Sequence, residues 1–432
     1  MSQPANPHAA IATTAAGVGD AALTTADGKP LRAALLRSQG RARRRAFLLV
    51  LPLLLFILVT FVVPIGQMLQ RSFYNDGFSR NMPQVSAWFA STERGTDPDD
   101  AAWAALAADL TQAAADRTIG VVGTRINYDM AGTRSLFTST GRAVRGGLEP
   151  PFDAALTGID AKWGDPMLWS VMREASTPYT ANFYLSSLDR TRDADGNIVQ
   201  VEERQRVYLM LFWRTFWLSG LITVLTFVLG FPIAYLLATL PMRKSNLLMI
   251  LVLLPFWTSL LVRTTSWMVL LQQQGVLNDI FVWLGLINNT GRLQMIYNQI
   301  GTIVAMTHIL LPFMILPLYA VMRTINPSYA RAARSLGATS WTTFRRIYFP
   351  QTLPGLGAGA LLVFILAVGY YITPALVGGS SGQLISNMIA MHMTGTLNWS
   401  MAAALAALLL GAVLALYMVY DLLVGVDNLK LG

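Results

Sequence analysis

The sequence predicts an all-α integral membrane protein with six transmembrane helices. Six apolar runs lie at about 47–69, 208–237, 247–271, 299–322, 355–377 and 400–425. Each run is at least as long as the ~20 residues that an α-helix needs to cross the hydrocarbon core of a bilayer. The composition agrees, because 54% of the 432 residues are hydrophobic and only 13% are charged. A single run of this kind can be a buried helix of a soluble protein, but six in one chain argue against that.

The distribution of basic residues predicts the orientation of these helices. The segments 1–46, 238–246, 323–354 and the C-terminus together hold 15 of the 32 lysines and arginines, whereas the loops 272–298 and 378–399 between other crossings hold only Arg292. Positive charge concentrates on the cytoplasmic side of membrane proteins, so both termini are expected in the cytoplasm. The net charge of +9 therefore points to membrane orientation and not to nucleic acid.

The composition also excludes some chemistry. Cysteine is absent, and the three histidines, at positions 8, 308 and 392, are widely separated. Disulfides, thiolate catalysis and a zinc cluster are thus not expected, and no metal site is predicted.

Along the chain, residues 1–46 are expected to be a disordered basic cytoplasmic tail and 47–71 the first, uncleaved transmembrane helix. Residues 72–205 follow as a periplasmic insert with 18 acidic and 12 basic residues. Its stretches 101–116 and 166–175 have helical composition, so a small, mostly helical domain is predicted. Residues 206–425 contain the other five crossings, and 426–432 form a cytoplasmic C-terminus.

The cytoplasmic loop 326–352 has the local signals of a helix-turn-helix. Pro327 suits a helix start, and Gly337 suits the left-handed turn that ends this helix. Ser340 is expected to cap a second helix, and Pro350 to stop it. An amphipathic helix lying on anionic lipid is the alternative interpretation.

The spacing in this loop resembles the EAA loop of bacterial ABC importer permeases, of pattern E-A-A-x3-G-x9-I-x-L-P. The matching residues are Ala332, Ala333, Gly337, Ile347 and Pro350, while Arg331 stands where the motif has Glu and Phe349 where it has Leu. In that family the loop fits a groove of the ATP-hydrolysing subunit. The segments 212–240, 254–270 and 369–379, and Asn398-Trp399-Ser400, are similar to spermidine/putrescine permeases in particular.

This resemblance implies a type I ABC importer permease fold and no catalytic residues or cofactor in this chain. It implies a partner ATPase dimer that uses ATP and magnesium, a second permease in a heterodimer, and a periplasmic substrate-binding protein. It also implies a multi-pass protein in the lipid bilayer of a bacterial inner membrane. Polyamines are the expected substrate, with an opine, thiamine, iron or sulfate left open.

Polar and aromatic residues within the crossings are candidates for the translocation path, because polar groups are costly inside a bilayer. Arg263 either gates the path or snorkels to the headgroups. Pro374 is expected to loosen the fifth crossing and expose backbone carbonyls. The full candidate set is Trp257, Thr258, Arg263, Tyr370, Tyr371, Thr373 and Pro374. Ordinary packing is the alternative for the two tyrosines, and anchoring at the membrane interface is the alternative for Trp257.

Two other classes of function fit the sequence less well. A membrane-embedded enzyme would need paired ionisable groups, and the only acidic residue between positions 204 and 420 is Asp279. The sequence Gly378-x-Ser380-x-Gly382 matches the nucleophile pattern of hydrolases but lies in a short loop after a membrane helix, without a carboxylate for a triad. A self-contained channel or secondary transporter would leave the EAA-like loop without a role.

Overall fold

The computed structural model describes residues 31–193 and 195–424. It divides into two compact units, Met1–Gln67 and Met68–Gly432. The expected conformations of residues 1–30 and of the C-terminus 426–432 lie outside the described residues.

The first unit contains the helix α2 (Leu31–Ile57), the π-helical turn η1 (Leu58–Val62) and the beginning of α3 (Val63–Arg71). The segment Arg43–Arg71 is long and apolar enough to cross a membrane. The disordered tail predicted for 1–46 is wrong for residues 31–46, which are helical. That segment is rich in Leu, Ala and Arg, which are among the best helix formers.

A proline explains the π-helical turn in this unit. Pro64 has no N–H, and its ring crowds the carbonyl of the residue four positions earlier. The wider turn of η1, in which the Val63 N–H donates to the Leu58 carbonyl, directly precedes Pro64. The helix thereby passes the proline without ending.

The insert between the first two crossings is mostly helical, as predicted. Its helices are α4 (Pro83–Ser91), α5 (Asp100–Ala115), α6 (Ile119–Asn127), α7 (Thr133–Ala143), η2 (Val144–Gly146), α8 (Phe152–Ile159), η3 (Ala161–Gly164), α9 (Pro166–Ala175), α10 (Asn182–Ser187) and η4 (Glu203–Gln205). The predicted helices over 101–116 and 166–175 are present as α5 and α9. A hydrophobic core that includes Leu106, Phe137, Trp163 and Met172 holds them together.

One element of the insert was not anticipated from the sequence. The strands β1 (Arg190–Arg192) and β2 (Ile198–Gln200) form an antiparallel hairpin in which Thr191 pairs with Val199. Gly196, in the connecting turn, has a φ of +85°, a conformation that glycine adopts without steric cost. Such short strands leave too little alternation to be predicted from the sequence.

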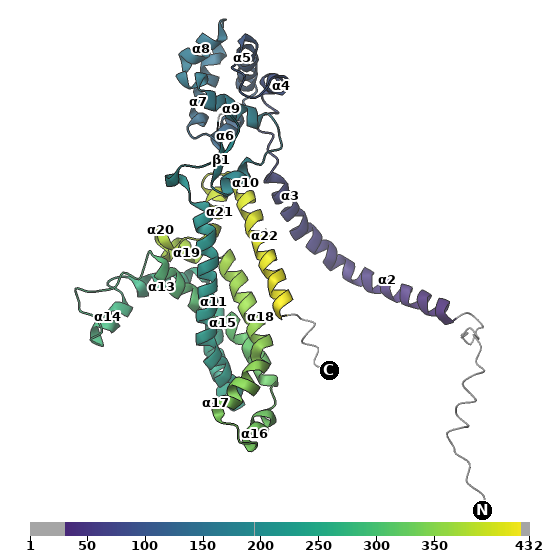
Figure 1. Ribbon diagram of the computed structural model, residues 1–432, viewed down its shortest axis with the longest axis vertical. Helices are drawn as coiled ribbons and strands as arrows, with labels where there is room; N and C mark the ends of the chain where they lie inside the picture. The colour runs from purple at the N-terminus through teal and green to yellow at the C-terminus, as the bar shows by residue number, and fades with distance from the viewer. Residues whose placement is uncertain (1–30, 194, 425–432) are drawn as a thin grey trace, which may run out of the picture. The chain divides into compact units, whose positions relative to one another are not determined.

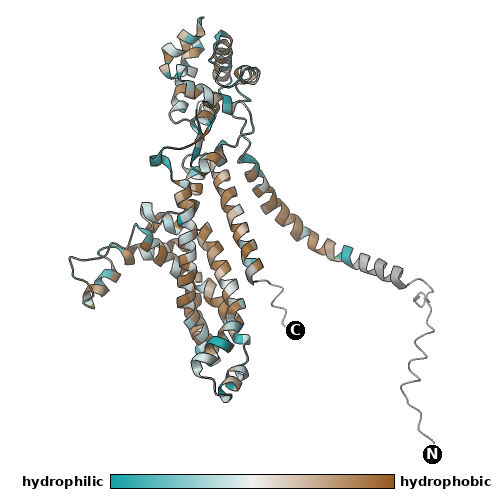
Figure 2. Cartoon of the chain, viewed as in Figure 1, coloured by the Kyte–Doolittle hydropathy of each residue, from teal (hydrophilic) through white to brown (hydrophobic). Residues whose placement is uncertain are grey.

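The remaining chain forms a helical core. Its elements are α11 (Tyr208–Thr239), α12 (Met242–Leu253), η5 (Leu254–Trp257), α13 (Leu260–Leu271), α14 (Val276–Trp283), α15 (Gln299–Thr324), α16 (Pro327–Ser335), α17 (Ser340–Thr343), η6 (Phe344–Tyr348), α18 (Phe349–Gly369), α19 (Ile372–Val377), α20 (Gly379–Gly382), α21 (Ile385–Thr394) and α22 (Trp399–Val424). The long helices α11, α15, α18 and α22 are hydrophobic along much of their length (Figure 2). Helices α11, α15 and α18 pack around buried residues such as Ile222, Met314 and Val363.

The number of continuous spans differs from the prediction of six. Within the described residues, five helices are long and apolar enough to cross a membrane, and a sixth span exists only as a bent pair. That pair, Met242–Trp257 and Leu260–Trp283, bends by 98° where the sequence predicted a continuous crossing over 247–271. Ser259 caps the second helix by accepting a hydrogen bond from the Val262 N–H at 3.2 Å. A capped helix start within the apolar run explains why the crossing is broken.

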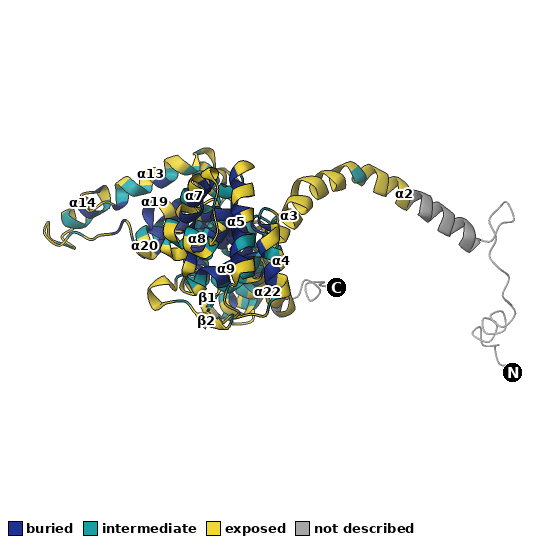
Figure 3. Cartoon of the chain, turned by 90° about the horizontal axis from the view of Figure 1, so that it is seen from above, coloured by how far each residue is buried: buried dark blue, intermediate teal, exposed yellow. Residues whose placement is uncertain are grey.

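The insert is joined to the core through α10 and the start of α11. Phe183 of α10 packs with Leu211 of α11 and Met401 of α22 in one buried cluster. Seen from above, buried residues (dark blue) gather in the middle of the packed helices, whereas residues 43–71 of α2, η1 and α3 are mostly exposed (Figure 3). The carboxylate of Asp189 accepts hydrogen bonds from the N–H groups of residues 207, 208 and 209 at 2.9–3.1 Å. This carboxylate caps α11 and fixes the insert to the second crossing.

Candidate coupling loop and translocation path

The loop that resembles the EAA motif is built on a precise turn after α16. Asn326 caps the helix by accepting a hydrogen bond from the Ser328 N–H at 2.9 Å. At the other end, the Ala338 N–H donates to the Ala333 carbonyl at 3.0 Å, and the Gly337 N–H donates to the Arg334 carbonyl at 2.9 Å. This pair of bonds is the Schellman motif. Gly337 has a φ of +88°, which confirms the predicted left-handed turn.

The tip of this loop is exposed and partly apolar. Leu336 is 88% exposed and Trp341 is 68% exposed. Ala332 and Arg331 are exposed beside them, and Ala333 is half-buried. Single exposed apolar residues are ordinary on soluble surfaces, but this group surrounds one tight turn. The turn therefore offers an apolar contact surface with small residues on one side and Arg331 where the motif has an acid.

The second half of the loop differs from the prediction in two ways. Thr339, and not Ser340, is the cap, because its hydroxyl accepts a hydrogen bond from the Thr342 N–H at 3.2 Å. Pro350 does not stop the helix: it lies in the first turn of α18, and Ser340–Gly369 forms one helical span. The π-helical turn η6 precedes Pro350 just as η1 precedes Pro64. The wide turn again lets the helix pass a proline.

An aromatic cluster connects this loop to the second crossing. Phe344 of η6 meets Phe231 of α11 edge-on at 5.9 Å between ring centroids. Tyr348 meets Tyr235 of α11 in the same way at 5.4 Å, and Phe344 also stacks on the exposed Trp341 at 5.8 Å. Such aromatic pairs add about 0.5–1.5 kcal/mol each beyond their buried area. These contacts tie the base of the loop to α11.

Ile347 of the motif faces a cavity behind the loop. The cavity has a volume of about 470 Å³ and lies between the ends of α11 and α15 and the start of α16. Tyr235, Arg323 and Tyr329 line it together with Ile347. The aromatic contacts and this cavity were not found from the sequence, because nothing local marks Phe231 and Tyr235 among the many apolar residues of their crossing.

The candidate path residues fall into two groups. Thr264 of α13 and Thr373 of α19 are fully buried, and their hydroxyl oxygens lie 3.2 Å apart. Arg263 is half-buried and lies on α13 four residues before Trp267, whose side chain contacts His308 of α15. The Nε atom of Arg263 has no hydrogen-bond partner within the part of the chain that the structure describes. The structure thus brings a cluster of polar groups together from α13, α15 and the break after α18.

That break replaces the loosened helix expected at Pro374. Helix α18 ends at Gly369, and Pro374 lies buried in the first turn of the short helix α19. The carbonyls at the break, those of Tyr370 and Tyr371, are not left free, because side chains of the following segment donate to them. Ser386 donates to the first at 2.5 Å and Asn387 to the second at 2.7 Å. These two donors were missed because they lie 16 residues further along the chain.

Trp257 and Thr258 lie elsewhere, at the bend between η5 and α13. Trp257 is 72% exposed, and the Thr258 hydroxyl donates to the Pro255 carbonyl at 2.9 Å. No hydrogen bond among residues 31–193 and 195–424 joins either residue to the polar cluster of Arg263. Trp267 instead belongs to that cluster, because its indole N–H donates to Nδ1 of His308 at 3.1 Å.

Comparison with known proteins gives similarity over the helical core. The family described as "Binding-protein-dependent transport system inner membrane component" matches residues 212–425. The spermidine/putrescine transport system permease protein PotB of Salmonella typhimurium (strain SL1344) is 36% identical over 198 residues, covering 45% of this chain and 68% of that protein. The PotB protein of Escherichia coli (strain K12) is 38% identical over 182 residues, covering 42% of this chain and 66% of that protein. A probable sulfate transport system permease of Marchantia polymorpha is 28% identical over 193 residues, covering 45% of this chain and 65% of that protein.

Solved structures give weaker overlaps. A bacterial ABC transporter that imports the acidic polysaccharide alginate has 19% sequence identity and a TM-score of 0.41, covering 50% of this chain and 78% of the other. The methionine ABC transporter MetNI, in an inward-facing conformation, has 20% identity and a TM-score of 0.40, covering 52% of this chain and 98% of the other.

The family match begins four residues into α11 and ends at the last crossing, so it contains both the loop and the polar cluster and leaves out the insert. The chain therefore belongs to the family of binding-protein-dependent transport system inner membrane components and is a multi-pass permease subunit of an ABC importer, in a family without an ATPase domain of its own.

Proposed function

We propose that this permease imports polyamines such as spermidine and putrescine. The observation that carries the proposal is the similarity to PotB proteins at 36–38% identity over the core that contains the polar cluster. The sulfate permease relative is more distant, at 28% identity.

The loop 326–352 is proposed to dock the ATPase. Its exposed turn at Gly337 carries Leu336 and Trp341 outward, and its base is tied to α11 through the aromatic contacts of Phe344 and Tyr348. A partner ATPase dimer that binds ATP and magnesium would grip this turn, and its closure would move α11 and α18 together. Such coupling shifts the population between inward- and outward-facing states.

The translocation path is proposed to run past the polar cluster without holding the substrate tightly. Asp279, the only acidic residue between positions 204 and 420, forms an ion pair with Arg292 at 2.7 Å. The only other carboxylate of the membrane helices is Asp421, near the C-terminal end of α22. Between positions 204 and 420 the described chain therefore offers a polyamine no free carboxylate, and Arg263 repels it. A positive gate of this kind prevents a cation from resting midway, and substrate selection is left to a periplasmic binding protein.

A second candidate substrate is a small anion such as sulfate. The observation that favours it is Arg263, whose Nε atom is buried and without a partner in the described part of the chain. A buried guanidinium with an unused donor suits an oxyanion. The Marchantia relative at 28% identity is in line with this alternative.

The remaining partners follow from the same proposal. A second permease chain would complete the pore in a heterodimer, and the insert 72–205, in the periplasm, would face the binding protein. The insert's net charge of −6, from 18 acidic and 12 basic residues, would favour a partner with a basic surface.

The experiment is to purify this chain in lipid discs with the ATPase, partner permease and binding protein from the same system. ATP hydrolysis is then measured with spermidine, putrescine and sulfate, each in separate titrations. Stimulation by a polyamine and not by sulfate is the expected result. Stimulation by sulfate alone would replace polyamines with the anion, and Arg263→Gln should then abolish it.

A further inference from the structure

The insert contains a second concave site, away from the membrane helices. A cavity of about 500 Å³ lies between α4, α5, α8 and α9, which are together at one end of the insert in Figure 1. Its walls are aromatic, and aspartates lie along it. The walls include Trp88, Phe89, Trp103 and Trp169, and the acidic residues of the lining are Asp97, Asp153 and Asp195.

The aromatic walls are packed and fixed. Trp103 meets Trp169 edge-on at 5.0 Å between ring centroids, and Trp88 meets Trp169 at 6.0 Å. Trp88 and Trp103 are 9% and 8% exposed, so only a small part of each ring reaches the cavity. The indole N–H of Trp169 donates to the Trp163 carbonyl at 2.8 Å. The walls are therefore held in place before any ligand arrives, which lowers the cost of binding.

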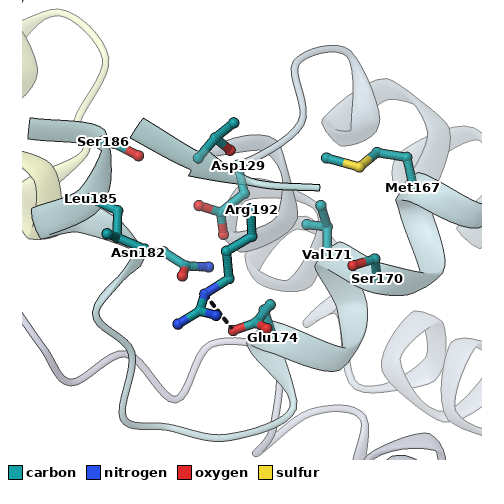
Figure 4. A pocket seen from close by; sticks show the side chains of 10 residues that line it. Asp129, Met167, Ser170, Val171, Glu174, Asn182, Leu185, Ser186 and Arg192 are labelled. Atoms are coloured by element: carbon teal, nitrogen blue, oxygen red, sulfur yellow. Dashed lines mark ion pairs between the residues drawn. The ribbon is translucent and has the colours of Figure 1, made fainter. Parts of the chain in front are cut away.

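The charges along the cavity leave negative charge without a partner. Within residues 31–193 and 195–424, none of the three aspartates forms an ion pair. Of the two arginines that line the cavity, only Arg94 is in an ion pair in these described ranges. Arg173 bonds to neutral oxygens and keeps its charge, so three aspartates stand against one uncompensated positive charge. Arg94 pairs with Glu174, which also lies 3.7 Å from Arg192 (Figure 4). Arg173 donates to the carbonyls of Phe89 and Thr92 at 3.0 and 2.8 Å.

Two of the aromatic rings already contact a cation, the guanidinium group of Arg173. The guanidinium carbon of Arg173 lies 5.0 Å from the ring centroid of Phe89 and 5.6 Å from that of Trp88. Both distances fall within the ~6 Å range of cation–π attraction. The same wall continues through Trp169 and Trp103, which carry no cation of their own in the described structure.

A metal ion does not fit this arrangement. No group of three or more His, Asp or Glu side chains among the described residues could hold one ion. The aromatic rings of the wall offer no oxygen ligand to a hard cation. Carboxylates beside an aromatic wall suit an organic cation, whose methylene groups contact the rings while its ammonium groups face the acids.

We propose that this cavity binds a small alkylammonium ion. The site is separate from the translocation path, and the inference does not rest on which solute is transported. If the transported solute is a polyamine, the cavity gives the permease a place where free substrate binds on the periplasmic side.

The test is calorimetric titration of putrescine and spermidine into the full-length chain in discs of zwitterionic lipid, without ATPase or binding protein. The neutral analogue 1,4-butanediol serves as the ligand control. The variant Asp97→Asn/Asp153→Asn removes two exposed carboxylates of the cavity and should fold. The matched variant Glu149→Gln/Glu202→Gln removes two exposed carboxylates elsewhere on the insert.

The expected result is saturable binding of the diamine and not of butanediol, weakened about tenfold or more in the cavity variant and unchanged in the matched variant. Binding that persists in the cavity variant would overturn the proposal, as would the absence of binding to the unaltered chain. In a separate titration with the binding protein, a cavity variant that loses affinity for that protein while its diamine binding is unchanged would make the site a protein-docking surface, and the proposal would be wrong. Polyamine-stimulated ATP hydrolysis tests the transport proposal independently of all these outcomes.

Discussion

Substitution of Gly337 tests whether the turn after α16 transmits force between the subunits. Gly337 has a φ of +88°, and a Cβ atom added there would meet no heavy atom within 4 Å. A side chain at position 337 therefore costs free energy only through the backbone conformation, and not through a steric clash. This separates the backbone requirement of the turn from any effect on its surroundings.

The magnitude follows from the backbone. An L-residue in the left-handed region costs roughly 1–2 kcal/mol, and Asn pays less because its short polar side chain tolerates that region. A β-branched residue is a stronger outlier there. If docking requires the native turn, a cost of about 1–2 kcal/mol weakens ATPase binding by a factor of roughly 5–30. The expected order of affinity is Gly, then Asn, then Ala, then Val at position 337.

The assay is titration of the ATPase subunit against the permease in lipid discs, with the dissociation constant and the stimulated ATP hydrolysis measured for each variant. Gly158→Ala is the matched control, because Gly158 of α8 also has open space at its Cβ but no positive φ. The control should behave as the unaltered protein does.

Two outcomes would refute the reasoning. The first is Gly337→Ala with unaltered affinity and hydrolysis, because the left-handed turn would then not matter for docking. The second is Gly337→Asn impaired as severely as Gly337→Val, because side-chain contact and not backbone conformation would then decide the effect.

Two further predictions concern the insert and the broken crossing. Burial raises the pKa of Asp109 above its ordinary value of 3.8, so the folded protein binds this proton more tightly than the unfolded chain and loses stability as the pH rises above that value. Asp109→Asn should therefore raise the unfolding temperature at neutral pH, and the gain should shrink near pH 3.8; an equal gain at both pH values would contradict this. The hydroxyl contact of Thr264 with Thr373 at 3.2 Å should give a coupling free energy of about 0.6 kcal/mol, and at most about 1.7 kcal/mol, in a double-mutant cycle of Thr→Val changes measured by unfolding. A coupling of zero would show that these hydroxyls do not hold α13 against α19.

Much of the fold follows from local features of the sequence. Helices α11, α15 and α22 begin and end within two residues of the apolar runs that predicted them. Hydropathy and length suffice there, because an apolar segment of that length must satisfy its own backbone hydrogen bonds in a bilayer. The conformation of Gly337 was equally predictable, since the turn needs a residue without a Cβ atom.

The effect of each proline on its helix could not be predicted from the sequence. Pro350 and Pro374 were expected to end or loosen helices, yet a π-helical turn carries the chain past Pro350, and the break near Pro374 occurs at Tyr370 instead. A missing N–H can be accommodated by a wider turn or by a break, and packing of neighbouring residues decides between them.

The sequence by itself therefore determined the membrane helices, the helical insert and the left-handed turn of the coupling loop, because hydropathy, length and backbone sterics act within a few residues. Three features appear only in the tertiary structure. They are the bend after Trp257 that breaks one membrane span, the contact of Thr264 with Thr373, and the aromatic contacts that join the loop to α11. The two threonines are 109 residues apart in sequence. Their contact depends on how whole helices pack, which no local pattern specifies.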